Sequence, residues 1–137
     1  MTELLDRMGQ LALFADLSGP QREALAHTYD EEVFPEGQRV LRQGLTGANL
    51  YVIVEGEAVI VIAGTERTRL SRGEFFGEVS ALLGSPPTAD VVASTPLRCL
   101  VIPGGEVRSF LVTYPHVAVR MLEAEAQRLA ATLQWLG

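Results

Sequence analysis

The sequence has 137 residues, of which 47% are hydrophobic, so it is long enough for one domain with a hydrophobic core and too short for two. All 11 basic residues are Arg, and they are scattered among 17 acidic residues to give a net charge of −6, which excludes the basic stripe that autonomous nucleic-acid binding requires. The sequence contains no Lys, and this excludes enzymes that depend on a P-loop lysine, a Schiff base or a Ser–Lys dyad.

Residues 1–30 predict a helical segment. Ser18 is followed three residues later by Gln21, a pair typical of a capping box, and Pro20 suits the first turn of the helix that follows. The N-terminus has an early acidic residue and no apolar core of signal-peptide length, and no segment of the chain reaches about 18 apolar residues. We therefore expect a cytoplasmic protein without a membrane segment.

Residues 31–102 predict a mainly β unit, because short runs of β-type residues recur at near-regular spacing between glycine-containing turns. The seven runs are Glu32–Phe34, Gln38–Arg42, Asn49–Val54, Glu57–Ile62, Glu66–Leu70, Ala89–Ala93 and Arg98–Ile102. This spacing is typical of a sandwich, jelly roll or barrel. Residues 51–54 and 59–62 are apolar on both faces, so we expect the helices at the two ends of the chain to cover the outside of that sheet. Cys99, the only cysteine, lies in the last run and is expected to be a buried thiol without a disulfide partner.

Residues 103–137 predict two helices, with a break at Tyr114–Pro115 between a short one and a longer one. The longer helix carries an apolar stripe whose steps alternate between three and four residues: Val119, Leu122, Ala126, Leu129, Leu133 and Leu136. Such a stripe either packs on the chain's own β unit or pairs with a second copy of the helix, and it is too short to decide between these interpretations.

Residues 75–92, FFGEVSALLGSPPTADVV, predict a glycine turn followed by a short helix over 79–83. Backbone N–H groups at the start of such a helix point toward whatever lies above them, which suits an anion. The second half of the stretch, residues 85–89, carries hydroxyl groups and two prolines but no positive charge.

Several motifs in a fixed order resemble the cyclic nucleotide-binding domain family, the sensor module of bacterial catabolite-activator-like transcription factors, kinase regulatory subunits and gated channels. The motifs are residues 34–37 (FPEG), Gly44, residues 49–57 (NLYVIVEGE), residues 72–78 (RGEFFGE) and residues 91–93 (VVA). The resemblance runs from about residue 10 to residue 135. It implies a single domain, 1–137, with a β-roll over 31–102, an N-terminal helical segment and two C-terminal helices.

The resemblance also implies a ligand site in the phosphate-binding cassette. The residues that would face the cyclic phosphate are Gly77 and the N–H groups of Glu78, Val79 and Ser80, with Thr88 and Ala89 at the end of the cassette and Trp135 or Leu136 as a cap over the base. The Glu78 carboxylate would accept a hydrogen bond from the ribose 2′-hydroxyl, since an ionised carboxylate can only accept. Each residue also has a structural interpretation, because Glu78 suits the first turn of any helix, Gly77 any tight turn, and Trp135 packing on the roll.

The sequence departs from the family at Pro87, where the family has an Arg that pairs with the phosphate. Losing one side of a buried charged pair typically costs about 2–5 kcal/mol, which corresponds to a loss of affinity of roughly 30- to 3,000-fold. Arg72 and Arg98 are possible substitutes, although neither stands at the family spacing. Acidic residues nearby, Glu74, Glu78 and Asp90, oppose the entry of an anion.

We therefore expect a regulatory domain with weak or lost affinity for cAMP and cGMP, or for another small anionic ligand, and without a cofactor. The alternative is a ligand-free module that uses the C-terminal helix for docking or homodimerisation through residues 116–136. No helix-turn-helix pattern follows that helix, so DNA reading would need a longer regulator of which this chain is the sensor part. Catalysis is not expected: His27 and His116 fall outside the strands, which leaves no clustered ligands for a metal-dependent enzyme of the cupin kind.

Overall fold

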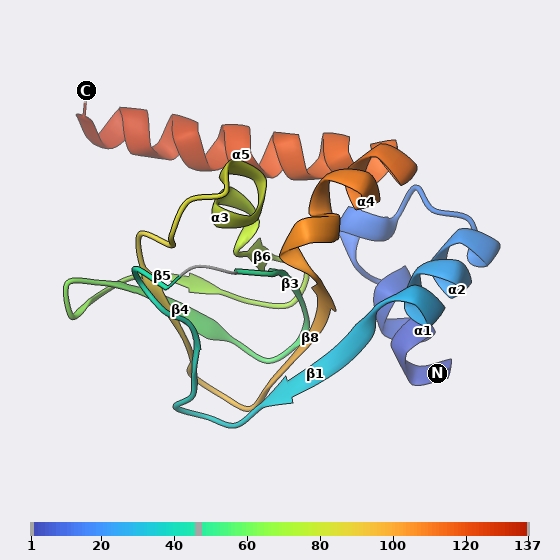
Figure 1. Ribbon diagram of the computed structural model, residues 1–137, viewed down its shortest axis with the longest axis horizontal. Coiled ribbons are helices and arrows are strands. Elements are labelled where there is room, and N and C mark those ends of the chain that lie inside the picture. Colours follow the sequence, from blue (N-terminus) through green and yellow to red (C-terminus); the bar gives the residue numbers. More distant parts are fainter. Residues whose placement is uncertain (1, 46–47, 137) are drawn as a thin grey trace.

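The structure is a computed structural model that describes residues 2–45 and 48–136, although the side chains of Thr2, Trp135 and Leu136 lie outside the described part. Helical elements at both ends of the chain flank a β-roll (Figure 1). The helical elements are α1 (Thr2–Gly9), η1 (Ala12–Phe14), α2 (Gly19–Thr28), α3 (Glu78–Leu83), η2 (Gly104–Glu106), α4 (Val107–Thr113) and α5 (Pro115–Leu136). The predicted fold class, with its N-terminal helical segment and two C-terminal helices, is confirmed.

The strands form two antiparallel four-stranded sheets. They are β1 (Asp30–Phe34), β2 (Arg39–Leu41), β3 (Leu50–Glu55), β4 (Ala58–Ile62), β5 (Thr65–Leu70), β6 (Phe75–Phe76), β7 (Asp90–Ala93) and β8 (Leu97–Ile102). Their orders are β1-β8-β3-β6 and β2-β7-β4-β5. All seven predicted runs form strands with bounds within two residues, whereas β6 was missed because two residues are too few to show an alternating pattern.

The local signals at the helix ends are also confirmed. The Ser18 hydroxyl accepts a hydrogen bond from the Gln21 amide at 3.2 Å, and the Gln21 side chain accepts one from the Ser18 amide at 2.9 Å, so the capping box is complete. Helix α4 ends at Thr113 and α5 begins at Pro115, as expected where a proline restricts the residue before it. The Cys99 thiol is buried.

The core consists of two apolar clusters on opposite faces of the sheet that contains β3. One lies between this sheet and the helices and includes Phe14 and Phe110, and the other fills the roll, where Tyr51 stacks on Phe76 at 4.9 Å between ring centroids. The prediction that both faces of β3 are covered is therefore confirmed. It was wrong for the end of β4, where Ile62 is 38% exposed.

Helix α5 determines which part of the roll is covered. It runs along one edge of the molecule from α4, across α3 and β6, to the far side (Figure 1). Its first half is anchored, because Val117 and Met121 are buried and Arg120 forms an ion pair with Asp16 at 2.9 Å. Helix α5 therefore lies directly above α3, in the segment that the sequence predicts to be a ligand cassette (Figure 1). Within the described residues, no helix combines the length and hydropathy that crossing a membrane requires.

Candidate ligand-binding site

The cassette begins with a turn that only glycine fits. Gly77 has φ of 88°, in the left-handed region, and a Cβ atom at this position would collide with the carbonyl oxygen of Asn49. The close approach to Asn49 lets β6 pair with β3 and directs the chain at once into α3. Gly77 is therefore required by the packing of the turn whether or not a ligand binds.

A cavity of about 280 Å³ lies between the cassette, the strands β2 and β4, and helix α5. All the cassette residues that the sequence singled out line it together, namely Gly77, Glu78, Val79, Ser80, Pro87, Thr88 and Ala89. Leu41, Ile60 and Ile62 form an apolar wall of the same cavity. The structure thus brings both halves of the 75–92 segment to one site, while the side chains of Trp135 and Leu136, the predicted base caps, lie outside the described residues.

Pro87 is buried in this cavity wall rather than extended into solvent. Its carbonyl oxygen accepts a hydrogen bond from the Gly44 amide at 2.9 Å. Three residues later, the Asp90 carboxylate accepts one from the Gln43 amide at 2.7 Å and pairs with Arg39 at 3.6 Å. The end of the cassette is therefore fastened to the chain that follows β2, and its proline contributes neither a charge nor an amide.

Neither of the two arginines considered as substitutes reaches the cavity. The Arg72 side chain donates to the Gln10 side chain at 3.4 Å, and Arg98 donates to Glu31 at 2.6 Å. Neither residue is among those that line the cavity. Neither position therefore places a positive charge at the cavity.

The guanidinium group in the site is that of Arg128 on α5, which sequence reasoning missed. It donates to the Phe75 carbonyl oxygen at 3.0 Å and to Glu125 at 2.9 Å, and its Cζ lies 4.5 Å from the centroid of the Phe75 ring. Its Nη1 is 3.6 Å from Oε2 of Glu78. Only the Glu125–Arg128 spacing on a predicted helix was visible in the sequence, because nothing local links residue 128 to a cassette 50 positions earlier.

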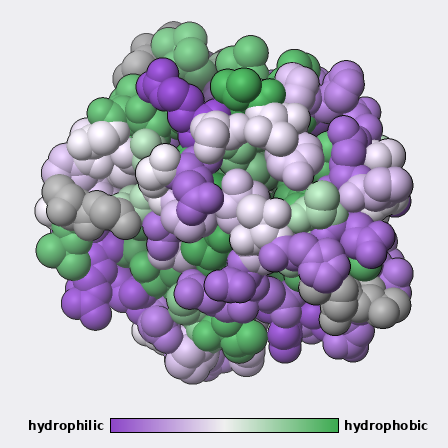
Figure 2. Space-filling model, turned by 45° about the vertical axis from the view of Figure 1, so that its right-hand side comes forward, coloured by the Kyte–Doolittle hydropathy of each residue, from purple (hydrophilic) through white to green (hydrophobic). Residues whose placement is uncertain are grey.

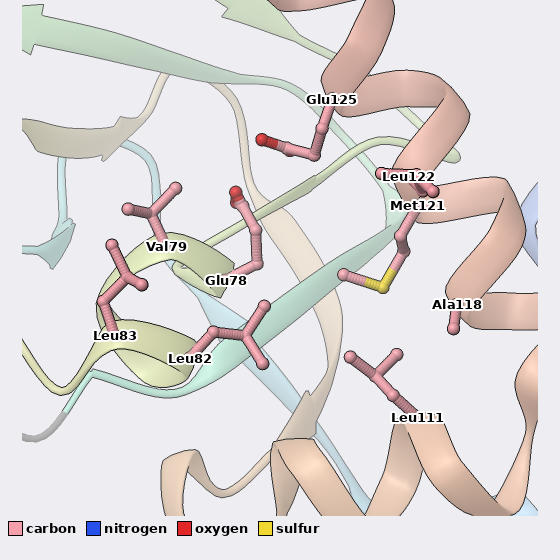
Figure 3. A pocket seen from close by; sticks show the side chains of 9 residues that line it. All are labelled: Glu78, Val79, Leu82, Leu83, Leu111, Ala118, Met121, Leu122 and Glu125. Carbon is pink, nitrogen blue, oxygen red and sulfur yellow. The ribbon is translucent and has the colours of Figure 1, made fainter.

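Glu78 is buried, with 5% of its surface exposed, and it lies between α3 and α5 (Figure 3). Burial raises the pKa of the Glu78 carboxyl to about 7, and repulsion by Glu125 acts in the same direction. The Arg128 guanidinium and the residue's own backbone N–H oppose this rise in pKa. Only above about pH 7 is the Glu78 carboxyl group ionised and therefore an acceptor alone, as a contact with the ribose hydroxyl would require.

A sequence model of the cyclic nucleotide-binding domain matches residues 31–114, more than half of the chain. The chain belongs to the cyclic nucleotide-binding domain family. The resemblance inferred from the ordered motifs is thus confirmed.

Individual proteins with cyclic nucleotide-binding domains are similar to this chain. It is 29% identical over 119 residues to a cGMP-dependent protein kinase of Eimeria tenella, covering 87% of this chain and 12% of the kinase. It is 30% identical over 99 residues to a cAMP-dependent protein kinase regulatory subunit of Mucor circinelloides f. lusitanicus, covering 69% of this chain and 23% of the subunit. The crystal structure of the catabolite activator protein of Thermus thermophilus matches with a TM-score of 0.78 and 26% identity over 90% of this chain and 61% of that one. The chain therefore spans less than a quarter of the length of either kinase relative.

The last helix of this cyclic nucleotide-binding domain presents its predicted stripe to solvent. Val119, Leu122, Leu129 and Leu133 are each more than half exposed, and Ala126 is exposed as well. Figure 2 shows apolar residues, in green, along the upper edge of the molecule where α5 lies. The interpretation in which these five residues pack on the chain's own roll is wrong, because α5 uses Val117, Met121 and Arg128 for that contact.

Proposed function

We propose that this chain is a regulatory domain in which α5 responds to the occupancy of the cassette cavity, and that its affinity for cAMP and cGMP is weak or lost. The observation that carries the proposal is the buried Pro87, which stands where the family has its phosphate-pairing Arg. Among the described residues that line the cavity, the cation is Arg128, which is held by Glu125, Glu78 and the Phe75 carbonyl group.

The charge of the cavity supports this conclusion. Its charged lining residues are Glu78, Glu125 and Arg128, so the fully ionised site has one excess negative charge. A cyclic phosphate would enter against this charge without the charge-assisted hydrogen bonds that an arginine provides. The absence of that contact alone is expected to weaken binding by roughly 30- to 3,000-fold.

The position of Arg128 supports a regulatory role. A ligand that hydrogen-bonds to Glu78 competes with Arg128 for the same carboxylate, so occupancy of the cavity and docking of α5 are linked. The relatives include a kinase regulatory subunit and a catabolite activator protein, whose names also denote regulation. The output that α5 would control belongs to whatever protein or domain acts with this one.

Calorimetric titration with cAMP and cGMP tests the proposal, together with the shift in melting temperature that a bound ligand causes. The wild-type chain should show no saturation at the micromolar concentrations that would saturate an intact sensor. Pro87→Arg should gain at least about tenfold in cAMP affinity, because it returns the guanidinium to the cassette. Pro86→Arg is the matched control, since it adds the same charge at the neighbouring proline, which lines the same cavity but is exposed, and it should gain less.

Two outcomes would contradict the proposal. Micromolar cAMP binding by the wild-type chain would show that the cavity compensates for the proline. Equal gains from Pro87→Arg and Pro86→Arg would show that general electrostatic attraction, rather than the cassette position, limits binding.

A second candidate function is a docking or homodimerisation module that uses residues 116–136. The exposed stripe on α5 favours it, since apolar positions at alternating spacings of three and four residues suit pairing with another helix. Sedimentation analysis of Leu129→Glu against Gln134→Glu tests this function, because both residues are exposed on α5 but only Leu129 lies in the stripe. A dimer that Leu129→Glu dissociates and Gln134→Glu preserves would support it, and a wild-type monomer at high concentration would contradict homodimerisation.

A further inference from the structure

Two carboxyl groups and one guanidinium group meet at the contact between α3 and α5. Arg128 Nη1 lies 2.9 Å from Oε1 of Glu125 and 3.6 Å from Oε2 of Glu78. The side chains of Glu78 and Glu125 extend toward each other from the two helices (Figure 3). The cluster therefore has one positive charge for two acidic groups, and one of these is almost fully buried.

The other charged groups packed around this contact have different partners. Glu74 lies on the turn before β6 and lines a separate pocket together with Arg128. Its carboxylate accepts hydrogen bonds from the Ser71 amide at 2.8 Å and from the Ser71 hydroxyl at 3.4 Å. Glu123 on α5 lines a separate groove together with Arg120. From β2, β4 and the cassette loop, the residues that line the cavity are uncharged. The charge imbalance is thus confined to Glu78, Glu125 and Arg128.

We propose that a proton held between Glu78 and Glu125 docks α5 on α3, and that loss of this proton as the pH rises loosens the part of α5 beyond Met121. This device goes beyond the proposed function, because it requires no nucleotide. It makes the position of α5 depend on pH through residues of this chain alone.

The direction in which pH changes the docking of α5 follows from the geometry. With one carboxyl protonated, the cluster is neutral and the two acids share a hydrogen bond beside Arg128. With both ionised, a buried negative charge is left over, and burial of an unpaired charge is strongly unfavourable. Moving the second half of α5 outward exposes Glu78 to water and relieves this cost. The raised pKa of Glu78, about 7, agrees with this direction: docking is favoured below that pH and weakened above it.

The rest of the α3–α5 contact is poorly filled, which leaves the cluster with a large share of the docking. A groove of about 360 Å³ separates the two helices, and the apolar side chains of Leu82, Leu111 and Leu122 line it (Figure 3). Val117, and Met121 at the near end of the groove, are buried and hold the start of α5. Beyond it, Leu129 and Leu133 are exposed. Movement is therefore expected after Met121 rather than along the whole helix.

Nuclear magnetic resonance of the full chain from about pH 5 to pH 9 tests the proposal, since carboxyl carbon shifts report on each glutamate separately. One carboxyl of the Glu78–Glu125 pair should titrate near pH 7. The backbone amides of residues 122–134 and the Arg128 side-chain N–H should change with the same midpoint, while the amides of residues 118–120 stay constant.

Three variants separate the proposal from a merely structural role for the cluster. Glu78→Gln should abolish the midpoint near pH 7, and Glu125→Gln should lower it, because one source of repulsion is removed. Glu123→Gln is the matched control on the same helix and should leave the midpoint unchanged. The proposal is overturned if both carboxyls of the wild-type chain titrate at the ordinary glutamate pKa, or if one titrates near pH 7 while α5 gives no response.

Discussion

Two charged clusters, one between α1 and the sheet that contains β3 and the other between α3 and α5, differ in charge balance. Where α1 meets the sheet, Arg7 and Arg98 face Glu31 and Glu55, so two cations meet two carboxylates. The Arg98 guanidinium lies 2.6 Å from the Glu31 carboxylate and 3.4 Å from that of Glu55. At the cassette, one cation meets two carboxyl groups. A balanced cluster fixes α1 against β1, β3 and β8 at any pH where its members are ionised. The unbalanced cluster is stable only with a proton or with a change of structure, which is typical of functional sites rather than of scaffolding.

The largest expected effect that distinguishes the clusters is the pH dependence of stability. The pKa of Glu78 is raised from 4.5 to about 7 in the folded chain, so its contribution is fully present below pH 4.5 and is lost as the pH rises through 7. The free energy of unfolding should therefore fall by up to about 3 kcal/mol over this window. Urea denaturation at a series of pH values measures it. Glu78→Gln should flatten the curve, and an unchanged slope would show that some other group titrates.

At high pH, a Glu→Gln change at the balanced cluster should lower the free energy of unfolding, whereas the same change at Glu78 should raise it. Glu31→Gln removes the carboxylate that pairs with both Arg7 and Arg98, so it should destabilise the chain by about 1–2 kcal/mol at pH 6 and at pH 8 alike. Glu78→Gln should stabilise the chain at pH 8, because it removes a buried charge. Urea denaturation of both variants at the two pH values checks the comparison, and it fails if the two changes have the same sign at pH 8.

The balanced and unbalanced clusters also show what a sequence can reveal. Strands, turns and the capping box depend on neighbours in the chain, so the pattern around Gly73 and Gly77 and the Ser18–Gln21 pair sufficed to place them. The sequence also shows that position 87, where the resemblance implies an arginine, is a proline, because its spacing from Glu78 is fixed. The position of Arg128 beside Glu78 could not be predicted from the sequence, since it depends on the path of α5 across α3. For the same reason the sequence could not decide which face of α5 is exposed.

Removing the Arg128 cation alone is expected to have a smaller effect on stability. Arg128→Met keeps much of the apolar contact with the Phe75 ring but removes the hydrogen bond to the Phe75 carbonyl group and the charge beside Glu78. We expect a loss of about 1 kcal/mol in the free energy of unfolding at pH 6 and a further rise in the Glu78 pKa, because the group that opposes the rise is gone. Carboxyl titration by nuclear magnetic resonance measures the second effect. A lower Glu78 pKa in this variant would contradict the assignment of Arg128 as its partner.

Breaking an ion pair that lies outside both clusters should have the smallest effect on stability. Arg120 donates two hydrogen bonds to Asp16, at 2.9 and 3.3 Å, and this exposed pair joins α5 to the loop after η1. Hydrogen bonding to Arg120 lowers the pKa of Asp16, so any stabilisation is present near neutral pH and is lost only in acid. Water and salt screen such pairs, so Asp16→Asn should leave the melting temperature at pH 7 nearly unchanged. A large drop would mean that the anchored half of α5 depends on this pair as well as on Val117 and Met121, and the boundary of the mobile part would then lie earlier in the helix.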